Sequence, residues 1–216
     1  NPEYLLFSAK NKGDKKPGLL IYLHGVGGVA DDVLRLQGQA RALLEGINRF
    51  EKGPCHVVVP QCSRTRKAGG RGTWEASDLD LLLKGLSSSL NFNSKRIYLT
   101  GDSMGGYGSW KWGVKSLQLF AAIAPVGEDR TGMIEDVTPD LHQWAANLAK
   151  VPVYAFAGAN DRLVPAERSE RMVNAIRKAG SKLAKIKVYQ DQGHNARQVV
   201  YSSNEFYDWM FAQKRK

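Results

Sequence analysis

The stretch that decides the fold runs Arg96-Ile97-Tyr98-Leu99-Thr100-Gly101-Asp102-Ser103-Met104-Gly105-Gly106. Residues 96–100 have the length and the apolar, β-branched and aromatic content of a buried strand, and residues 104–116 have a helical pattern. Only the pattern Gly-x-Ser-x-Gly lies between the two, so the chain must turn sharply there. A strand that passes through such a turn directly into a helix is typical of α/β proteins.

Ser103 stands in the middle of this turn and is the candidate nucleophile. A sharp turn forces the serine backbone into a strained conformation and aims its hydroxyl out of the sheet edge. The glycines at 101 and 105 remove side chains that would collide with neighbouring backbone, and the helix N-terminus behind the serine favours developing negative charge. The alternative is a structural glycine turn, because the five-residue pattern alone is common by chance.

Outward from this turn, short apolar runs alternate with helical patterns along the chain. We expect strands at 19–23, 56–59, 96–100, 121–125, 153–157 and 184–189, and helices at 30–50, 79–90, 104–116, 166–179 and 204–213. Strands this apolar are covered on both faces, which predicts a three-layer α/β fold with a mostly parallel central sheet and helices on both faces. No linker is visible, so residues 1–216 are expected to form one domain, with 127–150 as a candidate small cap or lid.

The composition is that of a globular protein. A chain of 216 residues can bury a large core without a disulfide or a structural metal, and 43% hydrophobic and 24% charged residues exclude a disordered chain. The net charge of +10 can favour nucleic acid or acidic polymers. No nucleic-acid-binding motif accompanies the charge, so a solvated basic surface is the simpler interpretation, and no specific nucleic-acid partner is expected.

Membrane and compartment signals are weak in this sequence. No run of 18 apolar residues exists, so no transmembrane segment is expected. No signal peptide is visible in a sequence that begins at Asn1, and both a cytoplasmic and a secreted location stay open. The oligomeric state is not predicted.

The two cysteines, Cys55 and Cys62, flank an apolar run at 56–60. If this run is a strand with a rise of ~3.3 Å per residue, the two alpha carbons lie roughly 20 Å apart. A disulfide needs a separation of at most about 7 Å. A bridge between them is therefore not expected unless the chain folds back after Pro60.

A serine hydroxyl needs a base to remove its proton, and His194 and Asp161 are the candidate base and acid. Each directly follows an expected strand, and in a parallel sheet such positions gather at one edge. Asp161 would accept a hydrogen bond from the imidazole and fix its tautomer. The alternatives are a surface-loop histidine and a turn aspartate. Glu167 is the reserve acid, and Asp102 is set aside because the strained turn points it elsewhere.

Acyl transfer also needs N–H donors for the oxyanion. The residue after the nucleophile, Met104, supplies one candidate backbone donor. The glycine-rich loop His24-Gly25-Val26-Gly27-Gly28 follows the strand at 19–23 and supplies the other, with Val26 preferred and Gly25 second. An ordinary glycine turn is the alternative, since the loop lacks the Lys-Ser/Thr of a phosphate-binding loop.

Three further features border the expected edge of the sheet. Trp74 is a candidate aromatic wall for substrate, with simple packing as the alternative. His24 is a candidate substrate contact, although its ring is better placed to brace the loops around the site. Residues 64–71 carry four cations and no acid, and we hypothesise that they attract anionic substrates.

Together these motifs resemble the α/β-hydrolase superfamily over residues 19–214, nearly the whole chain. Within it they look closest to small carboxylesterases related to phospholipase/carboxylesterase, polyhydroxybutyrate-depolymerase-like and feruloyl-esterase-like enzymes. The motifs that carry the resemblance are Tyr22-Leu23-His24-Gly25, Thr100-Gly101-Asp102-Ser103-Met104-Gly105-Gly106-Tyr107-Gly108, Phe120-Ala121-Ala122-Ile123-Ala124-Pro125, Gly158-Ala159-Asn160-Asp161 and Gly193-His194.

The resemblance implies Ser103 as nucleophile, Asp161 as acid, His194 as base, and no cofactor or metal. It implies a serine carboxyl-ester hydrolase that acts through an acyl-enzyme on small or medium esters, plant-cell-wall and other carbohydrate esters among them. The chain departs from the pattern at Asn195, where relatives often carry an acid, and in the longer segment 127–150. The alternatives are a serine peptidase of the prolyl-oligopeptidase type and a non-catalytic basic binding module on the same fold.

Overall fold

The computed structural model describes residues 3–10, 16–29, 32–50, 53–62, 72–127 and 141–216. Within them, seven strands form one sheet in the order β1-β3-β2-β4-β5-β6-β7. β1 runs antiparallel to β3, and every other neighbouring pair is parallel. The strands are β1 (Tyr4–Phe7), β2 (Gly18–Leu23), β3 (Cys55–Pro60), β4 (Ile97–Asp102), β5 (Ala122–Val126), β6 (Val153–Gly158) and β7 (Ala184–Tyr189).

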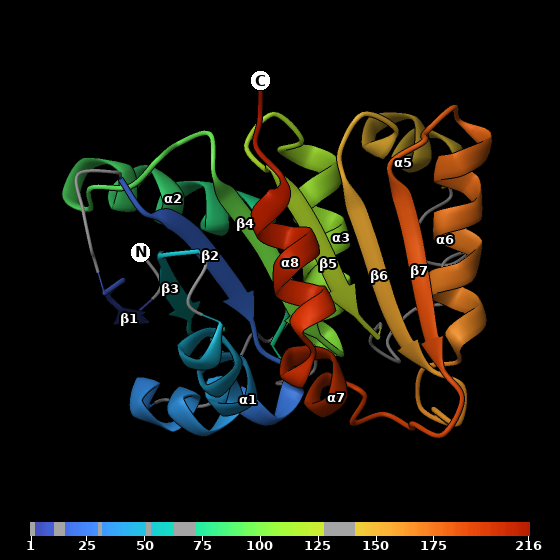
Figure 1. Cartoon of the computed structure of the whole chain (residues 1–216), viewed down its shortest axis with the longest axis horizontal. Helices are drawn as coiled ribbons and strands as arrows, with labels where there is room; N and C mark the ends of the chain where they lie inside the picture. Colours follow the sequence, from blue (N-terminus) through green and yellow to red (C-terminus); the bar gives the residue numbers. More distant parts are fainter. Residues whose placement is uncertain (1–2, 11–15, 30–31, 51–52, 63–71, 128–140) are drawn as a thin grey trace.

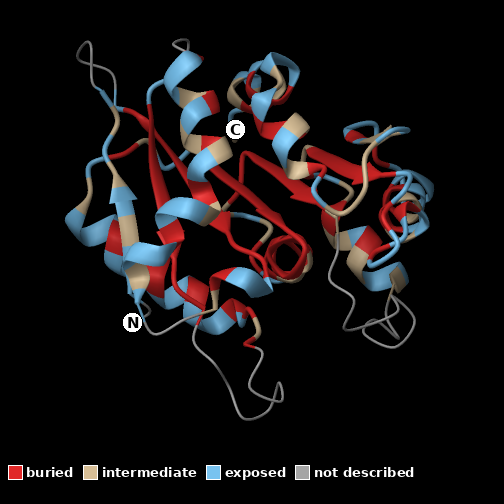
Figure 2. Ribbon diagram, turned by 90° about the horizontal axis from the view of Figure 1, so that it is seen from below, coloured by how far each residue is buried: buried red, intermediate tan, exposed pale blue. Residues whose placement is uncertain are grey.

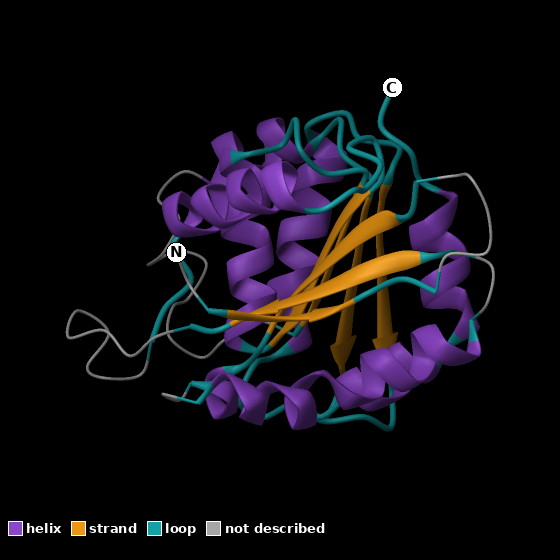
Figure 3. Cartoon of the chain, turned by 90° about the vertical axis from the view of Figure 1, so that its left-hand side faces the viewer, coloured by secondary structure: helices purple, strands orange, loops and turns teal. Residues whose placement is uncertain are grey.

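Helices cover both faces of the sheet, as Figures 1 and 3 show. One face carries α2 (Ala76–Ser89), α3 (Met104–Lys115), α5 (Leu141–Leu148) and α6 (Ala166–Lys178). The opposite face carries α1 (Leu36–Arg49), α7 (Arg197–Ser202) and α8 (Asn204–Ala212). Two short 3₁₀ helices, η1 (Val26–Gly28) and η2 (Val33–Arg35), connect β2 to α1. The predicted three-layer α/β fold is therefore confirmed.

The core lies in two layers, one on each side of the sheet. Along β2, Leu19, Ile21 and Leu23 pack into one layer, while Leu20 and Tyr22 pack into the other. Consecutive side chains of a strand point to opposite faces, so a continuous apolar run serves both layers. Figure 2 shows the buried residues concentrated along the strands and on the helix faces turned toward them.

The predicted elements are largely confirmed, with several corrections. All six expected strands and all five expected helical regions are present. The ends of the strands, and of the four helices after the first, lie within three residues of their predicted positions. The expected helix at 30–50 is wrong at its start, because η2 precedes α1. The sequence patterns missed β1, α5 and α7, which are four, eight and six residues long, because so few residues show little periodicity.

The segment 127–150, predicted as a cap or lid, lies partly outside the described residues, which omit 128–140. Its second part forms α5, where Trp144 stacks on Tyr107 of α3 at 6.4 Å between ring centroids. α5 also packs against α6. The lid itself stays a prediction.

Both cysteines are buried thiols that form no disulfide, as predicted, and burial raises the pKa of Cys62 to about 11. None of the helices in the described residues combines the length with the apolar content that a membrane-spanning segment requires.

The carboxyl ends of the parallel strands all lie at the same end of the sheet, toward the lower part of Figure 1. The loops after β2, β4, β6 and β7 leave from this end. They bring together residues that are far apart in the sequence, which is the usual place for a site in an open parallel sheet.

Candidate active site

Ser103 occupies a strained turn between β4 and α3. Its φ of 55° and ψ of −120° make it the one non-glycine residue with positive φ among those described. Such a conformation costs on the order of 1–3 kcal/mol and persists only where the surroundings enforce it. The Ser103 N–H donates to the Val126 carbonyl at 3.0 Å, which fixes the turn against β5.

Glycine at 105 allows this turn to approach β2. A Cβ atom added there would lie 1.8 Å from the backbone oxygen of Leu23, so no larger residue fits without moving the backbone of two elements. The sequence argument that this glycine removes a collision is confirmed. The hydroxyl-bearing residue is thus held beside the loop that follows β2.

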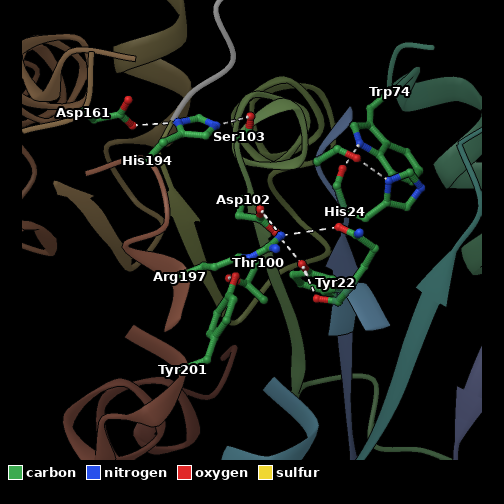
Figure 4. Close-up of polar contacts among 12 residues, drawn as sticks. Tyr22, His24, Trp74, Thr100, Asp102, Ser103, Asp161, His194, Arg197 and Tyr201 are labelled. Atoms are coloured by element: carbon green, nitrogen blue, oxygen red, sulfur yellow. Dashed lines mark hydrogen bonds and ion pairs between the residues drawn. The ribbon is translucent and has the colours of Figure 1, made fainter. Parts of the chain in front are cut away.

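Ser103, His194 and Asp161 are joined by hydrogen bonds, drawn in Figure 4. His194 Nε2 lies 3.0 Å from Ser103 Oγ, and His194 Nδ1 lies 2.8 Å from Asp161 Oδ2. The three residues come from the loops after β4, β6 and β7. The side chain of His194 is 30% exposed and that of Asp161 only 3%, so solvent reaches the histidine while the carboxylate is sheltered.

The Asp161 carboxylate is held on both of its oxygens. Oδ1 accepts the backbone N–H groups of Leu163 and Val164, both at 2.9 Å. Oδ2 is thereby left for His194. Because an ionised carboxylate only accepts hydrogen bonds, Nδ1 of His194 carries the proton in this arrangement, and Nε2 is free to accept one from the Ser103 hydroxyl.

The two predicted oxyanion donors lie at helix starts near Ser103. Met104 is the first residue of α3, and Val26 is the first residue of η1. N–H groups in the first turn of a helix have no intrahelical partner. A Cβ added to Gly25 would lie 3.3 Å from the Ser103 Cβ, so the β2 loop passes directly beside Ser103. The oxyanion roles of both residues stay predictions.

His24 and Trp74 form a buried brace beneath this loop. Their rings meet edge to face at 5.0 Å between centroids, and the Trp74 indole N–H donates to the His24 carbonyl at 3.1 Å. His24 Nε2 accepts the Cys62 N–H at 3.1 Å, and burial lowers the pKa of His24, so the ring is a neutral acceptor. The bracing interpretation of His24 fits these contacts, and the predicted substrate contacts of both residues stay predictions.

The remaining candidates lie elsewhere. The basic run 64–71 falls outside the described residues. Glu167, the reserve acid, is exposed on α6. Asp102 does not contact His194. Its carboxylate binds Tyr22 and Arg197 instead, as the sequence argument about the strained turn implied.

Sequence reasoning missed the contact between Asp102 and Arg197. The Arg197 Nη1 donates to Asp102 Oδ2 at 2.8 Å, and the Tyr22 hydroxyl donates to the other Asp102 oxygen (Figure 4). A signal was available, because a charged residue stands inside a Gly-x-Ser-x-Gly turn and an arginine follows the candidate base by three positions. Neither could be placed without knowing how the last loop folds back.

Comparison with known proteins gives a family. The model of the dienelactone hydrolase family matches residues 71–202, more than half of the chain. Two curated relatives carry the name "Putative carboxymethylenebutenolidase". The Escherichia coli (strain K12) protein is 34% identical over 99 residues, and the Salmonella typhimurium protein is 31% identical over 105 residues. These matches span 46% and 47% of this chain but only 36% and 37% of the relatives.

Solved structures share the fold. A thermostable esterase superposes on 98% of this chain and 59% of its own with a TM-score of 0.80 and 25% identity. A ferulic acid esterase superposes on 97% of this chain and 91% of its own with a TM-score of 0.70 at 18% identity.

Proposed function

The chain belongs to the dienelactone hydrolase family, and on that premise we propose that it is a serine hydrolase that cleaves carboxylic esters through an acyl-enzyme. One observation carries the proposal. Ser103, His194 and Asp161, which lie on three separate loops, meet in a continuous hydrogen-bonded row at the carboxyl edge of the sheet. This order and geometry fit a nucleophile, a general base and an orienting acid.

In the proposed acylation step, Ser103 Oγ attacks the ester carbonyl carbon while its proton passes to His194 Nε2. The imidazolium that forms is stabilised by Asp161, which keeps its negative charge. The carbonyl oxygen becomes an oxyanion. When the tetrahedral intermediate collapses, the bond between the carbonyl carbon and the alcohol oxygen breaks, and His194 returns the proton to the leaving alcohol.

Deacylation repeats the sequence with water as the nucleophile. His194 takes a proton from water, the hydroxide adds to the acyl carbon, and the bond to Ser103 Oγ breaks. The proton returns to Ser103 and the carboxylic acid leaves. The backbone N–H groups of Val26 and Met104 are proposed to hold the oxyanion in both halves, which typically contributes 10²–10³ in kcat per donor.

The proposed substrates are small or medium esters, including lactones. Support comes from the family and from the relatives, whose name, carboxymethylenebutenolidase, contains that of the butenolides, which are cyclic esters. Ferulic and other carbohydrate-linked esters are proposed as a second group to test. The His194 side chain is partly exposed, which suits an alcohol that leaves into solvent.

The proposal is tested by a panel of p-nitrophenyl esters from acetyl to octanoyl, a dienelactone, a methyl ferulate and a matched p-nitroanilide. We expect turnover of short esters, and at least a 10³-fold loss of kcat in Ser103→Ala, because catalysis through the hydroxyl is removed. Ser88→Ala, at an exposed position on α2, is the matched control. A fluorophosphonate should add to Ser103, detected by peptide mass.

Two outcomes would contradict the proposal. Full activity in Ser103→Ala would exclude the nucleophile. A kcat/KM for the anilide above that of the matched ester would favour the peptidase alternative instead.

A further inference from the structure

We propose that Arg197 and Asp102 form a positioning pair that holds the His194 loop against the nucleophile turn, an inference that rests on the proposed function. Asp102 immediately precedes Ser103, and Arg197 follows His194 by three residues. Their ion pair therefore joins the segment that carries the nucleophile to the segment that carries the base, without using an atom of either catalytic side chain.

The contact is short, sheltered and shared among several groups. Arg197 Nη1 lies 2.8 Å from Asp102 Oδ2 and 3.4 Å from Gln39 Oε1. The side chains are 22% and 9% exposed. Tyr22, which is fully buried, donates its hydroxyl to the second Asp102 oxygen and lies 3.0 Å from the Gln39 carbonyl. Both ends of the pair thus have additional partners that restrict their motion.

The other end of the His194 loop is anchored by Asn160, the residue that precedes the proposed acid. The Asn160 N–H donates to the Gln192 carbonyl at 2.9 Å, and the Asn160 side-chain amide donates to the Gln190 carbonyl at 2.8 Å. Asn160 is the residue before Asp161. One neighbour of the acid and one neighbour of the nucleophile therefore hold the two ends of the segment that carries His194.

The charges at this place are better explained by positioning than by stability. Burying an ion pair costs desolvation free energy, and the attraction between the two charges seldom exceeds that cost by much. Buried ion pairs are therefore weak stabilisers of the fold. Burial by itself disfavours the Arg197 guanidinium, but neighbouring groups, with Asp102 foremost among them, together raise the pKa of Arg197 above its ordinary value. Arg197 stays charged, and its planar fork fixes direction as well as distance.

The expected consequence is a change in kcat with little change in KM. A catalytic group displaced by about 1 Å can cost on the order of 10²-fold in rate. Arg197 does not touch the serine, the histidine or the acid among the described contacts, so substrate binding is expected to be spared. A smaller fraction of folded protein would also lower the apparent kcat without changing KM, so the rates are expressed per titrated active site to separate the two.

The experiment compares Arg197→Met, Arg197→Lys and the control Arg41→Gln on p-nitrophenyl acetate, with rates expressed per fluorophosphonate-titrated site. Arg41 forms an exposed ion pair with Glu45 on α1, so its removal tests loss of an arginine away from the site. We expect Arg197→Met to lose 10- to 100-fold in kcat with KM within threefold of the parent. Arg197→Lys should recover part of the loss.

Arg197→Met leaves the Asp102 charge buried and can reduce folding, so Asp102→Asn/Arg197→Met is also measured. It removes both charges and keeps a group that can bond Tyr22. We expect this variant to fold and still show the low kcat. The low-field proton resonance of the bond between His194 Nδ1 and Asp161 should broaden or shift in both variants.

Parental kcat per site in Arg197→Met, or in the double variant, would overturn the positioning role. A parent that hydrolyses none of the esters would overturn the proposed function and this inference with it. A parent that is active and depends on Ser103, but does not depend on Arg197, would overturn the inference alone.

Discussion

One carboxylate oxygen of Asp161 lies 2.8 Å from His194 Nδ1. The other accepts hydrogen bonds from two backbone N–H groups of its own loop, those of Leu163 and Val164. The proposed acid is therefore fixed before any substrate arrives. Its loop supplies the restraint, and only one oxygen is free to orient the imidazole.

Asp161→Asn tests this orientation. An amide that keeps its carbonyl oxygen on the two backbone donors presents an N–H to His194 and reverses the tautomer, so kcat should fall by roughly 10³- to 10⁴-fold. Steady-state rates on p-nitrophenyl acetate provide the measurement. Asp191→Asn, an exposed aspartate in the β7 loop, should stay within twofold of the parent. Retention of more than a tenth of the kcat in Asp161→Asn would exclude the acid role.

Val26→Pro removes one proposed oxyanion donor while keeping the fold. Proline is well tolerated at the first position of a helix, and the preceding Gly25 has φ −73° and ψ 177°, an extended conformation compatible with a following proline. We expect kcat to fall by 10²- to 10³-fold with a melting temperature within a few degrees of the parent.

Val26→Ala accompanies it, because alanine keeps the N–H and isolates any side-chain effect. If proline and alanine at 26 give equal rates, the donor lies elsewhere in the loop.

Gly105→Ala should prevent the nucleophile turn from forming. The added methyl group would sit 1.8 Å from the Leu23 oxygen, and backbone on both sides would have to move. We expect loss of soluble protein, or destabilisation of more than about 3 kcal/mol by denaturant unfolding, of the size given by severe overpacking.

Gly85→Ala on α2 is the matched change. A Cβ there meets nothing within 4 Å, and alanine should stabilise the helix by about 0.5–1 kcal/mol. Equal effects at the two glycines would contradict the steric explanation.

His24 predicts a pH dependence of stability. Burial lowers the pKa of His24 below its ordinary 6.5, so the unfolded chain binds the proton more readily than the folded one. The stabilisation is complete above about pH 6.5 and declines as the pH falls below that value, with a slope of at most about 1.4 kcal/mol per pH unit for one proton.

Urea unfolding between pH 4.5 and 8 would measure this dependence. His24→Gln, whose side-chain oxygen can still accept the Cys62 N–H, should be less stable at pH 8 and flatter below pH 6.5. A variant with the parental slope would assign the acid sensitivity to another group.

Much of this site could be predicted, because several of its residues are marked by the sequence immediately around them. Ser103 is marked by the glycines of its turn, and His194 and Asp161 by their place after strands of a parallel sheet. The pairing of Arg197 with Asp102 could not be predicted, because it depends on where a six-residue helix, α7, meets the sheet. The burial of Trp74 and His24 likewise depends on how the loops after β2 and β3 pack together. Both depend on tertiary packing, which the hydrophobic periodicity of the sequence does not indicate.

The sheet order places the proposed nucleophile and the proposed base in regions of unequal support. Ser103 follows β4, which has neighbours on both sides, whereas His194 follows β7, which is one of the two edge strands of the sheet. Edge strands open more readily than central ones. If the proposed function holds, mild denaturant should therefore abolish turnover before the fluorescence of Trp110 and Trp112, which are buried on α3 against the sheet, changes. Activity would then be lost while most of the structure survives.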